Sequence, residues 1–158
     1  PQLIDSVLMI IPENNLISLS DNIPSYLPLD GFVSQRMEST FFNLDKAHGG
    51  IDIVAKEGTP ISSAASGIVV FSGWTYEMGN LIIIYHGGDY MTHYGHNQNN
   101  LVSRLDIVKR GDVIGYVGNT GISSGPHLHF EVWKGQNSID PLIYFPHYLD
   151  KDLTLKDK

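Results

Sequence analysis

The sequence predicts a small all-β protein, an antiparallel distorted sandwich or half-barrel of short strands with Gly-rich loops and little helix. Three observations support this fold class. The 158 residues include 16 glycines and 8 prolines, which interrupt long helices. Short runs rich in β-branched residues recur at close spacing, with glycine turns between them. Apolar residues make up 42% of the chain and charged residues 17%, which is typical of a globular domain.

The expected strands follow one another closely in the middle of the chain. They are expected at residues 51–54, 67–74, 80–86, 90–96, 112–117 and 127–133. A Gly87-Gly88-Asp89 turn joins two of these strands directly and predicts a hairpin. Helical turns are expected only at 101–108 and 141–149, and prolines limit the second of these segments.

The chain is expected to contain one folded domain, because its 158 residues are close to the ~150 typical of a single domain. We expect an N-terminal arm or remnant of an upstream region at 1–28, the domain at 29–146 and a C-terminal tail at 147–158. Pro1 is not a native start, which indicates a processed form or a fragment. Targeting or anchoring sequence is therefore expected outside this chain.

Charge and composition argue against several classes of partner. The chain has 10 basic and 17 acidic residues and a net charge of −7, which argues against a nucleic-acid partner. No apolar run approaches the ~18 residues of a membrane span, so we expect none in this chain. The chain has no Cys, which excludes disulfides, thiolate zinc sites and Cys nucleophiles. This absence is neutral about compartment, although it suits a protein that works in an oxidising envelope.

A first candidate pair of metal ligands is His48 and Asp52, four residues apart. Gly49 and Gly50 lie between them and oppose a helix, so we expect His48 to end a loop and Asp52 to lie on the following strand. The glycines would allow the backbone to fold the imidazole and the carboxylate toward one ion. The alternative is a histidine in a surface loop and an aspartate in a turn.

A second candidate pair is His127 and His129, on the last expected strand. Residues two apart on a strand point to the same face, ~6–7 Å apart, so both imidazoles face one side together with Glu131. Apolar residues alternate with them and face the other side. The alternative is the solvent-facing side of a half-buried sheet. Glu131 is expected to assist a neighbouring histidine rather than to act as the general base.

The remaining histidines give a less direct signal. His93 and His96 are three residues apart, so on one strand they face opposite sides and at most one easily reaches the site. His93 is expected to be half-exposed, His86 to lie in a turn and His147 to lie at the surface.

Two histidines and one carboxylate suit a catalytic Zn²⁺ site with an open position, because a structural zinc site fills all four positions with protein atoms. Spacing alone leaves open whether His127 or His129 is the ligand. A Ser–His–Asp triad is less well supported. Residues 121–125 match the letters Gly-x-Ser-x-Gly, but no helix is expected after them, as a nucleophile elbow requires. The Gly-rich segment 118–126 lacks the Lys of a phosphate loop and is expected to form the rim of a substrate groove.

Several segments together resemble the lysostaphin/LytM-type zinc endopeptidases, which cut peptide bridges of bacterial peptidoglycan. They include the sequence His-Gly-Gly-Ile-Asp at 48–52 and the sequence His-Leu-His at 127–129. The matching segments, in the order found in the family, are 48–55, 58–70, 79–86, 90–96, 109–115 and 118–131. The resemblance covers roughly residues 29 to 145.

The resemblance implies one Zn²⁺ per chain, with His48, Asp52 and His129 as the metal ligands. It implies His96 and His127 as the catalytic pair, which would act on a metal-activated water and on the leaving amine. Leu is common in the family at the position of Asn97, so the groove wall is expected to differ.

The function implied by the resemblance is a zinc-dependent endopeptidase acting on the stem or bridge peptides of peptidoglycan. Its place would be the cell envelope, either periplasmic or extracellular, with an envelope partner or anchoring region outside this chain. The sequence leaves open whether a Gly–Gly bridge or a D-Ala–diaminopimelate cross-link is cut.

Two other functions remain as alternatives. One is a catalytically silent LytM-type activator of an envelope amidase, and the other is a non-enzymatic zinc-binding or adhesion module. The complete set of ligands and both catalytic histidines favour the enzyme. A further hypothesis is that the polar residues Glu13, Asn14, Asn15 and Asp21 of the arm occupy the open zinc position and hold the enzyme latent.

Overall fold

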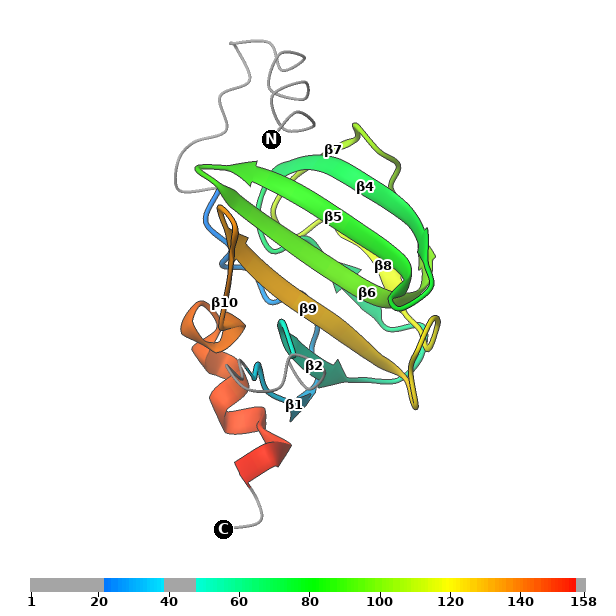
Figure 1. The fold of residues 1–158 in the computed structure, drawn as a ribbon, viewed down its shortest axis with the longest axis vertical. Coiled ribbons are helices and arrows are strands. Elements are labelled where there is room, and N and C mark those ends of the chain that lie inside the picture. The colour runs from blue at the N-terminus through cyan, green and yellow to red at the C-terminus, as the bar shows by residue number, and fades with distance from the viewer. Residues whose placement is uncertain (1–21, 39–47, 156–158) are drawn as a thin grey trace.

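The protein folds into a curved antiparallel sheet (Figure 1). A computed structural model describes residues 22–38 and 48–155, and in this part of the chain ten strands form one sheet. The strands are β1 (Phe32–Gln35), β2 (Ile51–Val54), β3 (Pro60–Ser62), β4 (Gly67–Thr75), β5 (Gly79–Gly87), β6 (Tyr90–Asn100), β7 (Ile107–Val108), β8 (Val113–Val117), β9 (His127–Lys134) and β10 (Asn137–Ile139). The predicted all-β, antiparallel class is confirmed.

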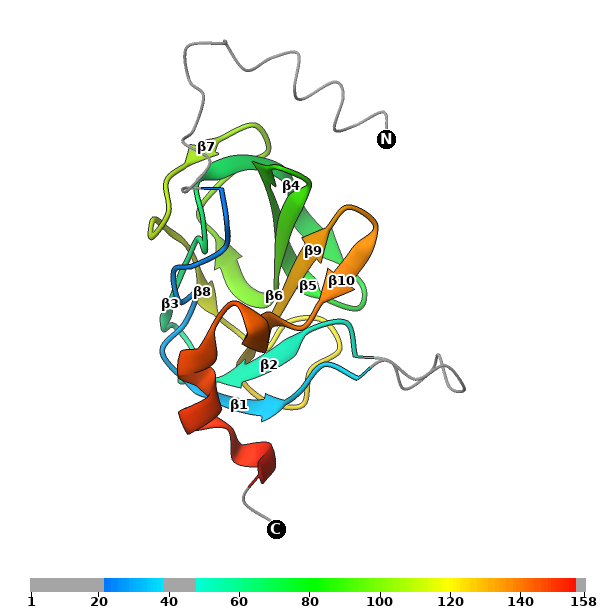
Figure 2. The same ribbon diagram turned by 90° about the vertical axis from the view of Figure 1, so that its left-hand side faces the viewer.

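The long strands β9, β6, β5 and β4 are neighbours in the sheet (Figure 1). The strand order is β1-β2-β9-β6-β5-β4-β7, with β10 added to β9 and with β8 pairing both β3 and β6. Strand β6 pairs with β9 over residues 90–95 and with β8 from Asn97 onward. In the view of Figure 2, β3 and β8 stand across from β9 and β10, which gives the sheet the curled shape of the predicted half-barrel.

Alternation along β9 separates the core from the opposite face, as the sequence predicts. Leu128, Phe130 and Val132 are fully buried in the core. The polar residues that alternate with them, His127, His129 and Glu131, project to the other side of the strand. Each large apolar side chain buried in this way contributes ~1.5–3 kcal/mol. The same core includes Ile51, Ile53, Ile61, Ile82, Ile84, Tyr94, Ile114, Val117, Phe145 and Tyr148.

The predicted hairpin between β5 and β6 is confirmed. Gly87, Gly88 and Asp89 all have positive φ angles, of 83°, 55° and 66°. Glycine adopts this region without the steric cost that a side chain imposes, and Asp tolerates it better than most residues. The turn places β5 and β6 in register, with Ile83 opposite His93.

All six expected strands are present, with shifts of a few residues at their ends. The strands β1, β3, β7 and β10 are additional, and none of them exceeds four residues. The helical turn expected at 101–108 is wrong. Leu105 has a φ of 77° and the Asp106 carboxylate accepts the Ser103 N–H, so the segment forms a turn and then pairs with β4 as β7.

Short helical turns occur at the C-terminal side of the domain, as predicted for 141–149. They are the 3₁₀ segments η4 (Pro141–Ile143), η5 (Pro146–Lys151) and η6 (Leu153–Leu155). Asp140 caps η4 by accepting the Leu142 N–H. The Tyr148 hydroxyl donates to the Leu29 carbonyl, and the buried Asp152 pairs with Arg36 just after β1. These contacts pack the C-terminal segment against β1, beside which it lies in Figure 1.

The outer segments of the chain are described only in part. Residues 25–28 hydrogen-bond to the segment between β3 and β4 and to β3 itself. The polar arm residues at 13–15 and 21 lie outside the described residues, so the latency hypothesis and the division of the chain at 28 and 146 stay predictions. Across the described residues, we find no helix with the length and apolar character that crossing a membrane requires.

Candidate metal centre

Three of the predicted site residues meet where β2 pairs with β9. Asp52 in β2 lies directly opposite His129 in β9, and His48 lies three residues before the start of β2. The Asp52 Oδ1 atom is 3.0 Å from His48 Nε2 and 2.8 Å from His129 Nδ1. One ligand atom from each of the three residues lies within 4.8 Å of the others, a spacing suited to a shared metal ion.

Gly49 and Gly50 allow the chain before β2 to lie close against β9. A Cβ atom at Gly50 would collide with the carbonyl oxygen of Phe130. A Cβ atom at Gly49 would lie 3.1 Å from Glu131 Oε1. The two glycines therefore let the chain turn from His48 into β2 while the backbone lies against β9.

The two histidines expected to form the catalytic pair lie beside this cluster. The ring centroids of His96 and His127 are 4.7 Å apart, and those of His96 and His129 are 6.1 Å apart. His127 Nε2 is 3.7 Å from Asp52 Oδ2. The structure thus brings all five predicted site residues to one place.

The position of His96 depends on a break in β6. Its φ angle is 63°, which is uncommon for a residue with a side chain, and it lies where β6 changes partner from β9 to β8. The break ends the alternation of faces, so the prediction that His93 and His96 face opposite sides is wrong. His93 lies opposite Glu131, with His93 Nδ1 3.4 Å from Glu131 Oε2, and both histidines therefore lie on the face of the cluster.

The four imidazoles of the cluster and of the catalytic pair each have one nitrogen held by an oxygen acceptor behind the ring. These outer acceptors orient the rings, and three of them are backbone carbonyls. The pairs are His48 Nδ1 with Arg36 O at 2.9 Å, His96 Nδ1 with Thr120 O at 2.7 Å, His127 Nδ1 with Gly125 O at 2.7 Å and His129 Nε2 with Glu131 Oε1 at 2.8 Å.

These outer contacts determine what the inner nitrogens present. A carbonyl or carboxylate oxygen only accepts, so a neutral ring must direct its N–H outward and its lone pair inward. His48 Nε2 and His129 Nδ1 therefore aim lone pairs at the same Asp52 oxygen, which is itself an acceptor. Three acceptors at about hydrogen-bond distance require positive charge between them. Two nitrogen donors and one carboxylate are a ligand set that fits Zn²⁺.

The pKa shifts reflect the same demand for positive charge. Burial raises the pKa of Asp52, but the hydrogen bonds with His129 and His48 outweigh it and hold the pKa well below its usual value. Burial lowers the pKa of His129, but the hydrogen bonds with Asp52 and Glu131 outweigh it and raise the pKa to about 9. In the metal-free chain a proton on His129 supplies part of the positive charge that the cluster demands.

His96 differs from His129 in its electrostatics. Burial lowers its pKa, the hydrogen bond with the Thr120 carbonyl opposes this shift, and the neighbouring His127 reinforces it. The net effect keeps His96 neutral at pH 7. A neutral imidazole held by one nitrogen can accept a proton on the other.

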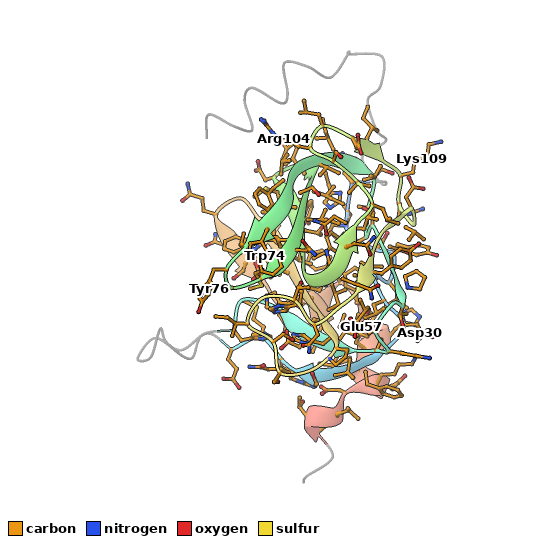
Figure 3. All side chains as sticks on the ribbon, turned by 90° about the vertical axis from the view of Figure 1, so that its right-hand side faces the viewer. Asp30, Glu57, Trp74, Tyr76, Arg104 and Lys109 are labelled. Atoms are coloured by element: carbon orange, nitrogen blue, oxygen red, sulfur yellow. The ribbon has the colours of Figure 1, made fainter. Side chains whose placement is uncertain are left out.

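Two loops border the cluster on the side of His96. The His96 N–H donates to the Met78 carbonyl in the β4–β5 turn at 2.6 Å, and the Ile122 N–H donates to the Glu77 carbonyl at 2.9 Å. The loop 118–126 therefore packs against the β4–β5 turn while its carbonyls hold His96 and His127. Figure 3 shows the exposed Trp74 and Tyr76 at this turn.

Besides His93, two further histidines lie outside the site. His86 was expected in a turn, but it is buried at the end of β5, where Nδ1 donates to the Ser66 carbonyl and Nε2 is 2.7 Å from the Thr92 hydroxyl. That prediction is wrong because both ring nitrogens have polar partners inside the protein, so the ring can be buried instead of facing solvent. His147 is exposed, as predicted.

The chain belongs to Peptidase family M23, whose profile it matches over residues 46–141. The resemblance to lysostaphin/LytM-type proteins is thereby confirmed at the level of the family. Among relatives, the Peptidoglycan DD-endopeptidase ShyC of Vibrio cholerae is 46% identical over 86 residues, which are 54% of this chain and 20% of the relative. The Murein hydrolase activator NlpD of Escherichia coli is 42% identical over 108 residues, 68% of this chain and 28% of the relative.

Solved structures show the same fold. Lysostaphin from Staphylococcus simulans aligns with a TM-score of 0.66 at 29% identity, covering 75% of this chain and 50% of that chain. A zinc-containing peptidase from Vibrio cholerae aligns with a TM-score of 0.67 at 30% identity, covering 73% of this chain and 38% of that chain. The chain spans less than a third of the length of the two relatives named above.

Proposed function

We propose that this chain is a zinc-dependent endopeptidase that hydrolyses peptide cross-links or bridges of bacterial peptidoglycan. The observation that carries the proposal is the convergence of His48 Nε2 and His129 Nδ1 on one oxygen of Asp52. Membership of a peptidase family supports it, as do the names of two similar proteins, a peptidoglycan endopeptidase and lysostaphin. His48, Asp52 and His129 would hold the ion.

A Zn²⁺ ion in this cluster would supply Lewis acidity, which polarises a carbonyl and lowers the pKa of water toward neutrality. The proposed task of His96 is to accept the proton of the attacking water on its inner nitrogen. Its lowered pKa favours the neutral form that this task requires.

His127, whose ring lies beside that of His96, would complete the proton transfer. Its Nδ1 atom is occupied by the Gly125 carbonyl at 2.7 Å, so Nε2 is the atom left to face the substrate. Because Nδ1 directs its N–H to the carbonyl, Nε2 carries a proton only when the ring is an imidazolium. In that form His127 would donate a hydrogen bond to the developing oxyanion or pass the Nε2 proton to the leaving amine. The loop 118–126 holds both rings in place through its carbonyls, which limits their rotation during the reaction.

The proposed substrate and location follow from the family rather than from charge. With a net charge of −7, the chain gains no long-range attraction toward the acidic stem peptides, so affinity must come from the groove. We propose a place in the cell envelope, periplasmic or extracellular. An envelope partner or an anchoring region outside this chain is part of the same proposal.

The experiment that tests this proposal is digestion of purified sacculi. We expect zinc-loaded chain to release muropeptides, chelator to stop the release, and added zinc to restore it. Mass spectrometry of the products identifies the bond, a Gly–Gly bridge or a D-Ala–diaminopimelate cross-link. Zinc-loaded chain that releases no peptide product from any sacculus type would contradict the endopeptidase.

A second candidate is the activation of an envelope amidase. It is favoured by the 42% identity with the Murein hydrolase activator NlpD over 68% of this chain. This function predicts no release of peptides by the chain alone and faster release of products when an amidase is added. The His96→Ala variant separates the two functions, because an activator keeps its effect without this residue whereas the enzyme does not.

A further inference from the structure

Glu131 is the carboxylate behind the candidate metal centre, and both of its oxygens are engaged. Its Oε1 atom accepts from His129 Nε2 at 2.8 Å. Its Oε2 atom accepts the indole N–H of Trp133 at 2.6 Å and lies 3.4 Å from His93 Nδ1. The side chain is only 11% exposed, so protein groups rather than water satisfy this carboxylate.

The surroundings of Glu131 are built from two strands and leave it little freedom. Glu131 and Trp133 lie on the same face of β9, and His93 lies on β6 opposite Glu131. The rings of His93 and Trp133 stack with centroids 5.8 Å apart and an angle of 23° between their planes. Gly49 lies against the carboxylate from the third side, where a Cβ atom would crowd Oε1.

We propose that Glu131, fixed by Trp133, is a positioning residue that sets the orientation of the His129 ring. Holding the N–H on Nε2 leaves Nδ1 as the lone pair that faces Asp52. The inference rests on the proposed zinc site and adds to it a specific support, the indole of Trp133. Hydrogen-bonded partners behind a metal-binding histidine typically change metal affinity about 10–100-fold when they are mutated.

The indole N–H of Trp133 fixes the Oε2 end of the Glu131 carboxylate. Without it, the Oε2 atom loses its shortest hydrogen bond, and the carboxylate can rotate away from His129 more easily. A Trp133→Phe substitution removes the N–H and keeps an aromatic ring beside His93. It therefore tests the hydrogen bond with little change in packing.

A Glu131→Gln substitution tests the same contact from the other side. The amide keeps one acceptor oxygen but turns its NH₂ group toward either His129 or Trp133, and both already donate to this side chain. Once Trp133 is replaced by Phe, the NH₂ group can occupy the vacated place and the amide oxygen can accept from His129. Glu131→Gln is therefore expected to cost less in the Trp133→Phe background than in the original chain.

The experiment is a double-mutant cycle of zinc affinity, measured by competition with a chromophoric chelator. We expect about tenfold weaker binding for Trp133→Phe, a loss of about 10–100-fold for Glu131→Gln, and a double variant weaker by less than the product of the two. The melting temperature of the metal-free chain is expected to change little in Trp133→Phe, which separates positioning from general loss of stability.

Trp74→Phe is the matched control, because Trp74 is 62% exposed on β4, a strand that does not pair with β9. Its zinc affinity should equal that of the unmodified chain. The chain has two tryptophans, so in this control Trp133 is the only one left and its fluorescence should change as zinc binds.

Two results would overturn the inference. One is Trp133→Phe binding zinc as tightly as the unmodified chain, and the other is an equal loss of affinity in Trp74→Phe. Failure of the unmodified chain to bind zinc at all is a separate outcome, since it contradicts the proposed function and removes the site on which the inference rests.

Discussion

At the scale of single residues, the cluster divides its histidines into two kinds. His129 is tied to a carboxylate on each side, whereas His96 is held by one backbone carbonyl. The side-chain pattern predicted which residue types gather here, but spacing left open the choice between His127 and His129. The outer acceptors Arg36 O, Thr120 O and Gly125 O had no signal in the sequence, because any residue type carries a carbonyl.

The two kinds of histidine are expected to respond differently to removal. His129→Ala should lose both zinc and hydrolysis, because it deletes a proposed ligand. His96→Ala should keep one zinc per chain and lower kcat about 10²–10⁴-fold, the range for a lost acid–base group. Elemental analysis of purified protein together with muropeptide release measures both effects. Full hydrolysis by His96→Ala would remove this residue from the mechanism.

His86 gives a pH dependence of stability that is independent of the metal centre. Burial lowers its pKa from 6.5 to about 4 in the folded chain. The unfolded chain therefore binds this proton more readily, so the stabilisation present above pH 6.5 is lost as the pH falls toward 4. From pH 7 to pH 4 this group alone is expected to reduce the free energy of unfolding by about 3 kcal/mol.

Urea unfolding at pH 7 and pH 4 measures this effect. The comparison is with His86→Gln, in which no group titrates at this position. The variant should lose less stability than the original chain over the same pH range. An identical pH dependence in both proteins would contradict the assignment.

At the scale of elements, the strands with runs of β-branched residues were predictable, whereas β1, β3, β7 and β10 were not. Strands such as β3 and β10 span three residues each and carry no alternation from which to predict them. The break in β6 at His96 could not be predicted from the sequence either, because it occurs where β6 stops pairing with β9 and begins to pair with β8. These elements are set by tertiary contacts rather than by local sequence.

The approach of β2 to β9 predicts unequal effects of Gly→Ala substitutions. Gly50→Ala should lower the free energy of unfolding by roughly 1–3 kcal/mol or more, since the new methyl group collides with the Phe130 carbonyl. It should also weaken zinc binding, because Asp52 lies two residues further along the chain. Gly125→Ala is the matched control, since its Cβ atom would have nothing within 4 Å. Chemical denaturation and zinc titration of both variants check this, and equal effects would be inconsistent with the packing described.

At the scale of the whole molecule, the proposed metal ligands lie on neighbouring segments of the sheet, Asp52 on β2 and His129 on β9. Binding to the folded state alone stabilises it, by about 2.7 kcal/mol when free zinc is 100 times its dissociation constant. For a chain of this size we expect zinc to raise the melting temperature by roughly 5–10 °C. Thermal unfolding with zinc and with chelator measures the shift. His129→Ala should show no shift, and a shift of the same size in that variant would place the zinc elsewhere.

The central claim is that one divalent ion is held by two imidazoles and one carboxylate, with a position left for water. A crystal structure of the zinc-loaded chain with anomalous data at the zinc edge tests it most directly. The expected result is a single zinc peak contacted by His48 Nε2, Asp52 and His129 Nδ1, with a solvent molecule as a further ligand. A peak at other residues, or an ion enclosed by four protein atoms, would contradict the account.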